Sequence, residues 1–431
     1  MNEGKIVVAV DVGTSKIVTL IARVDEEVNI LGVSEIKSVG IKKGQIVDIE
    51  EAVLAINNSL ESAERMAGYS ASHVIASIGG SHIESINSRG VVAVSNPSGE
   101  ISKSDLDRVI EAAKAVSIPS SREIIHVLPR SYTVDGQDGI KDPIGMSGVR
   151  LEVDTHLISA SSISIRNFEK AFTEVGVDVD AFVFGGYASS LSVLSETEKE
   201  LGVIMVDIGA GTTDISVYLD GSVAYSSVIP IGARHITNDL AIGLRISLES
   251  AEKIKLFLSK PGGQIERKIT TEHLDGKTRE RSSDELDLSS LNLPEEVSKV
   301  SRKTLVEGII KPRLNEIFTF IGMELKKSGF VGQTPSGLVI TGGGSQTIGV
   351  VEAAKRMLAM PVRLGIPVDI KGIIDEVQNG AFAASVGLIA YGGEIEDKAS
   401  LPFGFSLPKI PGIKINKVLS KAIAFIKSFM P

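Results

Sequence analysis

The chain has 431 residues, of which 43% are apolar and 23% charged, as expected for a globular protein with more than one domain. It has no cysteine, which excludes disulfides and thiolate chemistry, and its six histidines show no ligand-spaced pair, which argues against a transition-metal site. The net charge of −9 argues against general nucleic-acid binding, and without a signal peptide or spanning run we expect a cytoplasmic protein.

Two apolar runs joined by a short turn open the chain. Residues 7–17 read VVAVDVGTSKI, which predicts a β-hairpin. Gly13 allows the backbone to expose its N–H groups, and Thr14 and Ser15 add hydroxyl donors. Asp11 lies where the first strand ends. A turn so rich in donors suits phosphate oxygens.

An inserted module interrupts the pattern that follows. After a strand at 29–39 and a helix over 50–67, residues 83–165 have strands of their own and one helix that begins at Ser102. This segment contains no glycine-rich phosphate turn and no cluster of acid–base residues. We therefore expect a module that contacts other subunits or proteins rather than a catalytic one.

The second half of the chain repeats the first motif. A helix at 166–176, a strand and a helix at 188–200 precede IMVDIGAGTTDI, residues 204–215, which predicts a second hairpin. Its backbone and hydroxyl donors for phosphate are at Gly209, Gly211, Thr212 and Thr213, and Asp207 lies where its first strand ends. Two carboxylates at strand ends, Asp11 and Asp207, suit a hydrated Mg²⁺ beside a polyphosphate. The repetition predicts a duplicated fold that clamps one nucleotide.

Two later segments add candidates for the same site. The helix at 247–259 carries Glu252 and Lys255 on one face, a spacing that also fits an ordinary ion pair. Residues 260–297 are charged and rich in turns, and a long helix is expected at about 298–328. The strand that begins at residue 337 then ends in a third glycine-rich turn, Gly342, Gly343 and Gly344, which leaves space for a ligand against the backbone.

The end of the chain predicts a linker and an amphipathic helix. Residues 379–392 predict a helix of small residues, and the prolines and glycines of 393–412 exclude regular structure. Beyond residue 413 one arc of the helix is apolar, with Ile415, Val418, Leu419, Ile423, Phe425, Ile426 and Phe429, and the other is basic, with Lys414, Lys417 and Lys421. An all-basic polar face in an acidic protein favours an anionic membrane surface over the protein's own core or a partner groove.

These motifs resemble those of the actin-like ATPase superfamily. VDVGTSK and VDIGAGTTD are similar to its two phosphate motifs, and TGGGS to its adenosine motif. The resemblance is closer to FtsA, the bacterial cell-division family, through ASSLSVL, GARHITNDLAIGL, the insert at 83–165 and the basic terminus. It implies an α/β fold of two actin-like (ribonuclease-H-like) lobes around an ATP cleft, with an α+β insert in the first lobe.

The resemblance also implies roles for individual residues. The first turn, with Asp11, Gly13, Thr14, Ser15 and Lys16, would contact the phosphates and the hydrated metal. The second turn would face it, with Asp207, Gly209, Ala210, Gly211, Thr212, Thr213 and Asp214. The Glu252–Lys255 pair would meet the ribose and adenine, and the three glycines at 342–344 the adenosine. We expect at most a weak ATPase, because Gly185 and Gly186 stand where relatives carry a residue that orients the attacking water.

The expected domain boundaries follow from this fold. They are first-lobe core at 1–82 and 166–195, insert at 83–165, second-lobe core at 196–240 and 331–365, partner-binding insertion at 241–330, first-lobe return helix at 366–392, linker at 393–412 and membrane-targeting helix at 413–431.

The resemblance implies an ATP-binding cell-division protein that forms actin-like filaments and anchors the ring of the tubulin-like GTPase FtsZ to the cytoplasmic face of the membrane at the septum. A second-lobe helix with Arg302, Lys303 and Arg313 would receive the acidic C-terminal peptide of FtsZ. The alternatives are a pilus-assembly actin homologue and an ATPase of the chaperone or sugar-kinase type. A kinase has no use for a membrane helix and a chaperone would carry a further substrate domain, whereas the sequence excludes the pilus homologue poorly.

Overall fold

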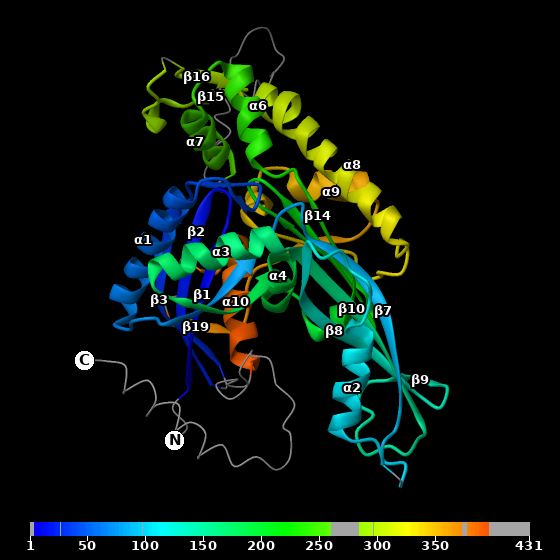
Figure 1. Cartoon of the computed structure of the whole chain (residues 1–431). Coiled ribbons are helices and arrows are strands. Elements are labelled where there is room, and N and C mark those ends of the chain that lie inside the picture. The colour runs from blue at the N-terminus through cyan, green and yellow to red at the C-terminus, as the bar shows by residue number, and fades with distance from the viewer. Residues whose placement is uncertain are drawn as a thin grey trace, which may run out of the picture. The chain divides into compact units, whose positions relative to one another are not determined.

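The computed structural model describes residues 4–25, 27–96, 98–259, 284–295, 297–372 and 377–395. One compact unit extends to Glu394 and contains two lobes, each built on a central sheet (Figure 1). The amphipathic helix expected at 413–431 lies outside the described residues, as does most of the linker. Within the described part of the chain, no helix is long and apolar enough to cross a membrane.

The first lobe is built on a six-stranded sheet. Its strands, in spatial order, are β11 (Asp178–Phe184), β6 (His73–Ile78), β1 (Lys5–Val12), β2 (Lys16–Val24), β3 (Val28–Lys37) and β19 (Ile370–Gly372). Helices α1 (Ile49–Ala67) and α3 (Ser162–Val175) cover one face, and α10 (Ala383–Glu394) packs on the other. Both β19 and α10 come from the far end of the chain, so distant segments complete this lobe.

The inserted module is a four-stranded antiparallel sheet covered by one helix. The strand order is β7 (Glu84–Ala93), β10 (Arg150–Ser161), β8 (Arg122–Val134) and β9 (Gln137–Ile140), and the helix is α2 (Lys103–Lys114). Ser102 and Asp105 form a capping box that fixes the start of α2. A Cβ at Gly90 would lie 2.2 Å from the carbonyl oxygen of Val109, so only glycine lets α2 approach β7 this closely.

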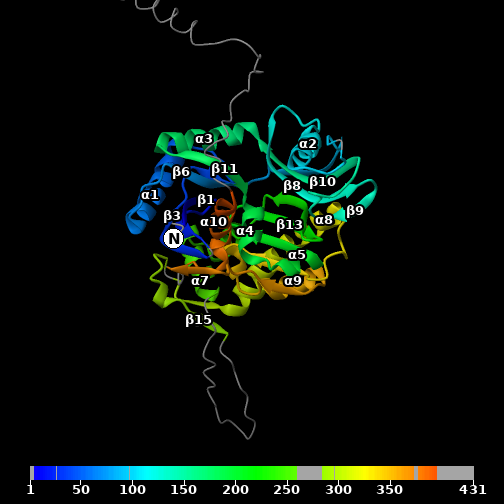
Figure 2. The same cartoon turned by 90° about the horizontal axis from the view of Figure 1, so that it is seen from below.

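The second lobe has a five-stranded sheet, and the insert leans against its edge (Figures 1 and 2). Its strands are β14 (Ser222–Ile229), β13 (Thr213–Leu219), β12 (Val203–Ile208), β17 (Leu338–Thr341) and β18 (Val362–Leu364). Ser85 of β7 donates to the carbonyl oxygen of Ser226 at 2.7 Å, and Nε2 of His156 lies 3.0 Å from the Ser226 hydroxyl. The insert, continuous in sequence with the first lobe, is thus bound to the second.

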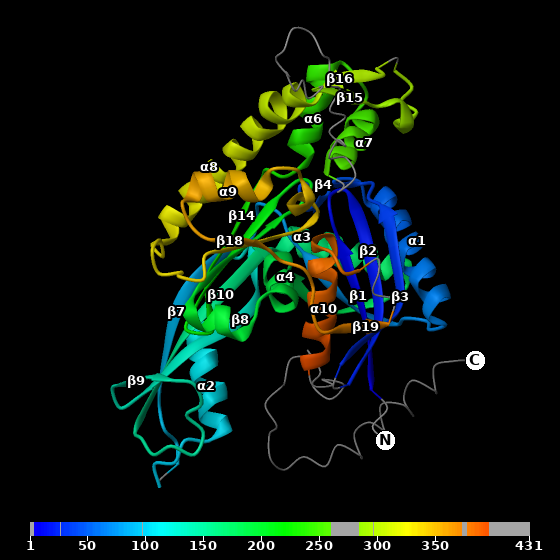
Figure 3. The ribbon, with the colours of Figure 1, turned by 180° about the vertical axis from the view of Figure 1, so that it is seen from behind.

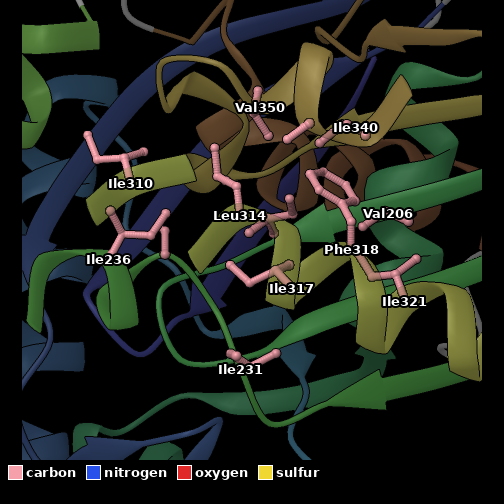
Figure 4. Close-up of a cluster of buried hydrophobic side chains, with 14 of the residues drawn as sticks. Val206, Ile231, Ile236, Ile310, Leu314, Ile317, Phe318, Ile321, Ile340 and Val350 are labelled. Carbon is pink, nitrogen blue, oxygen red and sulfur yellow. The ribbon is translucent and has the colours of Figure 1, made fainter. Parts of the chain in front are cut away.

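Helices cover the second-lobe sheet and its outer end. They are α4 (Gly185–Val193), α5 (Glu196–Leu201), α6 (Arg234–Leu244), α7 (Leu248–Ser259), the π-helix η3 (Thr304–Ile310), α8 (Lys311–Ser328) and α9 (Val350–Leu358). Figure 4 shows the core between them, where Phe318 and Ile321 of α8 lie with Val206 and Ile340 of the sheet. On the opposite side, α4 and α10 pack side by side between the two sheets (Figure 3).

Three expected boundaries are wrong. The single helix at 188–200 is two helices, because Leu194 is extended and the Ser195 hydroxyl caps α5. The long helix does not begin at 298, because Lys299–Ser301 form β16 and pair with β15 (Glu285–Asp287). The linker does not begin at 393, because α10 continues to Glu394 with Gly393 packed against Val24.

Candidate nucleotide-binding site

The two predicted phosphate turns lie against each other. Each is closed by the same type of hydrogen bond, from Gly13 N–H to the Lys16 carbonyl at 3.0 Å and from Gly209 N–H to the Thr212 carbonyl at 2.9 Å. A Cβ at Gly211 would lie 2.8 Å from the Thr14 hydroxyl oxygen, so the turns touch. Motifs from the two halves of the sequence therefore form a single site.

Three partly buried carboxylates lie between these turns. The Ser77 hydroxyl donates to Asp11 at 2.7 Å, and the Ser189 hydroxyl donates to Asp207 at 2.5 Å. Desolvation raises the pKa of Asp11, and desolvation together with the charge of Asp11 raises the pKa of Asp207 to about 7. Desolvation and the charges of Asp207 and Asp11 raise the pKa of Asp214 well above its ordinary value. A bound cation would favour the ionised form of all three.

Gly185 and Gly186, at the start of α4, leave room for the side chain of Asp214. A Cβ at Gly185 would lie 2.9 Å from Oδ2 of Asp214, and the Gly186 N–H donates a hydrogen bond to the same carboxylate. The other oxygen, Oδ1, has no hydrogen-bond partner among the described residues. Sequence reasoning found the two glycines but missed that a carboxylate from β13 fills the space they leave.

Two predicted phosphate ligands are engaged elsewhere. The Lys16 ammonium pairs with Glu35 at 2.7 Å and lies 4.1 Å from the centre of the Phe382 ring. Its charge still offsets a part of the rise that desolvation causes in the pKa of Asp11. The buried Thr213 hydroxyl donates to the carbonyl oxygen of Ile231 at 2.8 Å. If Lys16 contacts a phosphate, its ammonium must either bind the phosphate and Glu35 together or break its ion pair with Glu35.

A cavity of about 550 Å³ begins at Ser345, directly after the glycine turn of residues 342–344, and none of the three glycines lines it. A Cβ at Gly342 would lie 2.1 Å from Oδ1 of Asp207, which explains why only glycine fits beside β12. The cavity lining includes Leu256 and Ser259 of α7, Ser345 and Thr347 after the glycines, and Asn379 and Gly380 before α10. Its volume and mixed lining suit a nucleoside.

The Glu252–Lys255 pair lies on α7, one turn before this cavity lining. Lys255 is buried, and its ammonium contacts Glu252 at 2.8 Å and the Thr237 hydroxyl at 2.9 Å. The structure therefore contains the ion pair that the spacing allowed. Sequence reasoning missed Leu256 and Ser259, which continue the same helix face by one turn and could have been found from helical periodicity.

The arrangement fits a magnesium nucleotide on three counts. The Asp214 Oδ1 atom lacks a partner, the glycines at both turns bring backbone close to the space between them, and a nucleoside-sized cavity adjoins the third turn. Mg²⁺ keeps most of its waters and binds one or two carboxylates together with phosphate oxygens, which is the role predicted for Asp11 and Asp207.

This two-lobed fold, with paired hairpin turns between the lobes, defines an actin-like protein. A solved PilM–PilN type IV pilus biogenesis complex aligns over 90% of this chain and 99% of its own with a TM-score of 0.61 and 14% identity. The ethanolamine utilization protein EutJ from Carboxydothermus hydrogenoformans aligns over 89% of each chain with a TM-score of 0.51 and 14% identity. At such identities the likeness shows the fold alone.

Sequence comparison then gives the family. The model for the SHS2 domain inserted in FtsA matches residues 80–159, and the model for cell division protein FtsA matches residues 204–387. Curated cell division protein FtsA from Pseudomonas aeruginosa is 38% identical over 398 residues, 91% of this chain and 90% of its own. That from Escherichia coli strain K12 is 34% identical over 404 residues, 91% of each. The chain belongs to the FtsA family of cell-division proteins.

The resemblance and the fold class expected from the sequence are thereby confirmed, and the pilus-assembly alternative is not favoured.

Proposed function

We propose that this chain binds ATP with Mg²⁺, assembles into actin-like filaments and anchors the FtsZ ring to the cytoplasmic face of the membrane at the septum as a peripheral protein. Membership of a cell-division family supports a role in cell division. The observation that carries the nucleotide is the contact of two donor-rich turns around three carboxylates, beside a cavity of about 550 Å³. ATP hydrolysis is at most weak. The insert contacts neighbouring subunits in the filament or other division proteins.

The proposed nucleotide contacts use residues of both lobes. N–H groups of the two turns donate to phosphate oxygens, Asp11 and Asp207 hold the metal through water, and the cavity that begins at Ser345 takes the nucleoside. The bound magnesium nucleotide supplies the cation that the carboxylates lack. Calorimetric titration of the full chain with ATP tests this, because chelation of Mg²⁺ should weaken binding strongly.

The three cations proposed for the FtsZ peptide differ in how they are engaged. Arg313 forms a bidentate pair with Asp239, at 2.6 and 2.9 Å, and also contacts Glu316. The Nε atom of Arg302 is buried and has no hydrogen-bond partner in the described part of the chain, although the residue as a whole is partly exposed. Because Arg313 is already paired, we assign the acidic peptide to Arg302, whose guanidinium would donate to the peptide carboxylates.

Replacing Arg302 by Glu is expected to weaken binding of the acidic FtsZ C-terminal peptide by roughly tenfold or more, because a charge-assisted hydrogen bond contributes about 1.5–3 kcal/mol. Fluorescence anisotropy of a labelled peptide measures the change. Lys326→Glu, the same charge change on the exposed end of α8, is the control and should have little effect. Equal losses in both variants would mean that net charge, not Arg302, attracts the peptide.

A chain that ends before Ile413 is expected to lose vesicle binding while it keeps its melting temperature and its ATP binding. The compact unit ends at Glu394, so the truncation removes none of its residues. Each lysine near an anionic leaflet contributes about 1 kcal/mol, and the apolar arc adds burial that salt does not screen. Sedimentation with anionic vesicles, with and without FtsZ and ATP, measures the effect.

The double replacement of Phe425 and Phe429 by Glu should abolish vesicle binding as the truncation does, because it places two charges on the apolar arc. If the truncated chain sediments with vesicles as well as the full chain, the tail binds a protein instead, and the membrane part of the proposal fails.

A further inference from the structure

A small β-hairpin of the first lobe ends on the first phosphate turn. Its strands, β4 (Ile41–Lys42) and β5 (Gln45–Ile46), are joined by Lys43 and Gly44. The buried side chain of Ile41 anchors the hairpin in the first-lobe core. The Gly44 N–H donates to the Thr14 hydroxyl at 3.2 Å. The hairpin tip therefore lies directly on a residue predicted to bind phosphate.

Close backbone packing holds this tip in place. A Cβ at Gly44 would lie 2.8 Å from the backbone of Gly79 and Gly80, and a Cβ at Gly80 would lie 2.8 Å from the carbonyl oxygen of Lys43. Gly79 in turn faces Asp214, whose Oδ2 would be 3.9 Å from a Cβ there. The tip therefore packs against both the turn that contains Thr14 and the turn of Gly79 and Gly80, and both turns border the candidate phosphate site.

Lys43 is not the residue that this turn favours. Lys43 and Gly44 have φ values of 50° and 74°, as in the two-residue hairpin turns that favour Asn or Asp before Gly. The left-handed backbone disfavours a lysine. The Lys43 side chain is exposed and forms no ion pair with any residue in the described ranges, whereas Lys16 of the neighbouring turn is paired with Glu35. Neither turn formation nor pairing explains this lysine.

The charge of the site supplies an explanation. Asp11, Asp207 and Asp214 present carboxylates to a ligand that is itself an anion, and Lys16 shares its charge with Glu35. Lysine carries a compact charge on a flexible four-carbon stem, which suits a phosphate that projects past the turn. We propose that Lys43 is a further phosphate ligand, which contacts the terminal phosphate of ATP and lets this chain distinguish ATP from ADP. The inference rests on the nucleotide binding proposed above.

Lys43→Asn provides a sharp test, because asparagine is favoured at this turn position and should fold at least as well. In the full chain, calorimetry should show Mg-ATP binding weakened about tenfold and Mg-ADP binding changed less than twofold, since only ATP has the third phosphate. Lys42→Asn, in the adjacent exposed strand position, is the matched control and should change neither affinity. The melting temperature of Lys43→Asn should equal or exceed that of the wild type.

Three results would overturn the assignment: unchanged ATP affinity in Lys43→Asn, equal losses for ATP and ADP, or the same loss in Lys42→Asn. Lys43→Arg, which keeps the charge, should retain most of the preference for ATP. If the wild type binds neither nucleotide, the proposed nucleotide function fails instead, so the two failures are distinguishable.

Discussion

Replacing Gly387 by alanine is expected to lower the free energy of unfolding by at least about 3 kcal/mol, or to prevent folding. Gly387 belongs to α10, and α10 packs beside α4 between the two sheets (Figure 3). A Cβ there would lie 1.7 Å from the carbonyl oxygen of Ala188 and 2.4 Å from its carbonyl carbon. Because both atoms are backbone, no side-chain rotation relieves the overlap, and α4 must move. Urea unfolding of the purified chain measures the loss.

Gly308→Ala is the matched control for this substitution. Gly308 lies in the π-helix η3, its φ is not positive, and a Cβ there would meet nothing within 4 Å. Alanine has a higher helix propensity than glycine, so the control should be neutral or more stable by up to about 1 kcal/mol. If the two variants unfold alike, the close contact of α10 with α4 does not determine stability.

Replacing Asp207 by asparagine is expected to abolish Mg-ATP binding and yet to stabilise the protein measured without nucleotide at pH 8. The folded Asp207 carboxyl has a pKa of about 7, whereas its ordinary value is 3.8. Between these values the folded state binds more protons than the unfolded state, so the stability of the wild type falls as pH rises from about 4 to 7. Asparagine is neutral throughout and removes this loss.

The expected gain at pH 8 is about 2 kcal/mol, less than the full shift implies because Asp207 is partly exposed. At pH 4 the two proteins should be nearly equal in stability. Urea unfolding at both pH values measures the difference, and Asp107→Asn on the exposed face of α2 is the control, because it removes a charge far from the site. A variant that is less stable than the wild type at pH 8 would contradict the proposed desolvation of Asp207.

Local patterns were sufficient to predict the hairpins and the insert. Each phosphate turn follows a continuous run of apolar residues and contains a glycine, and both signals depend only on neighbours in sequence. The helix predicted to begin at Ser102 does begin there, and its capping box joins Ser102 to Asp105, only three residues away. These features are visible in sequence because the interactions that create them are short in range.

Features created by distant segments were not predictable in the same way. Residues 299–301 form a strand because residues 285–287 pair with them, although the surrounding sequence favours a helix. Nothing near Gly185 indicates that Asp214 fills its empty side-chain position, and nothing near Lys16 indicates that Phe382 lies over its ammonium. Each of these contacts joins segments that only the folded chain brings together.

The discontinuous first lobe has a consequence for biosynthesis. Strands β1 to β3 are complete by Lys37, but β19, which pairs with β3, starts only at Ile370, and α10 follows it. At about 5–20 residues per second, a ribosome needs roughly 20–70 s to synthesise the intervening chain. During that interval α10 does not yet cover strands β1 and β2, and β19 does not yet pair with β3. The insert and most of the second lobe are nearly contiguous in sequence and can fold earlier, so we expect the nascent first lobe to expose its apolar surface longest during synthesis.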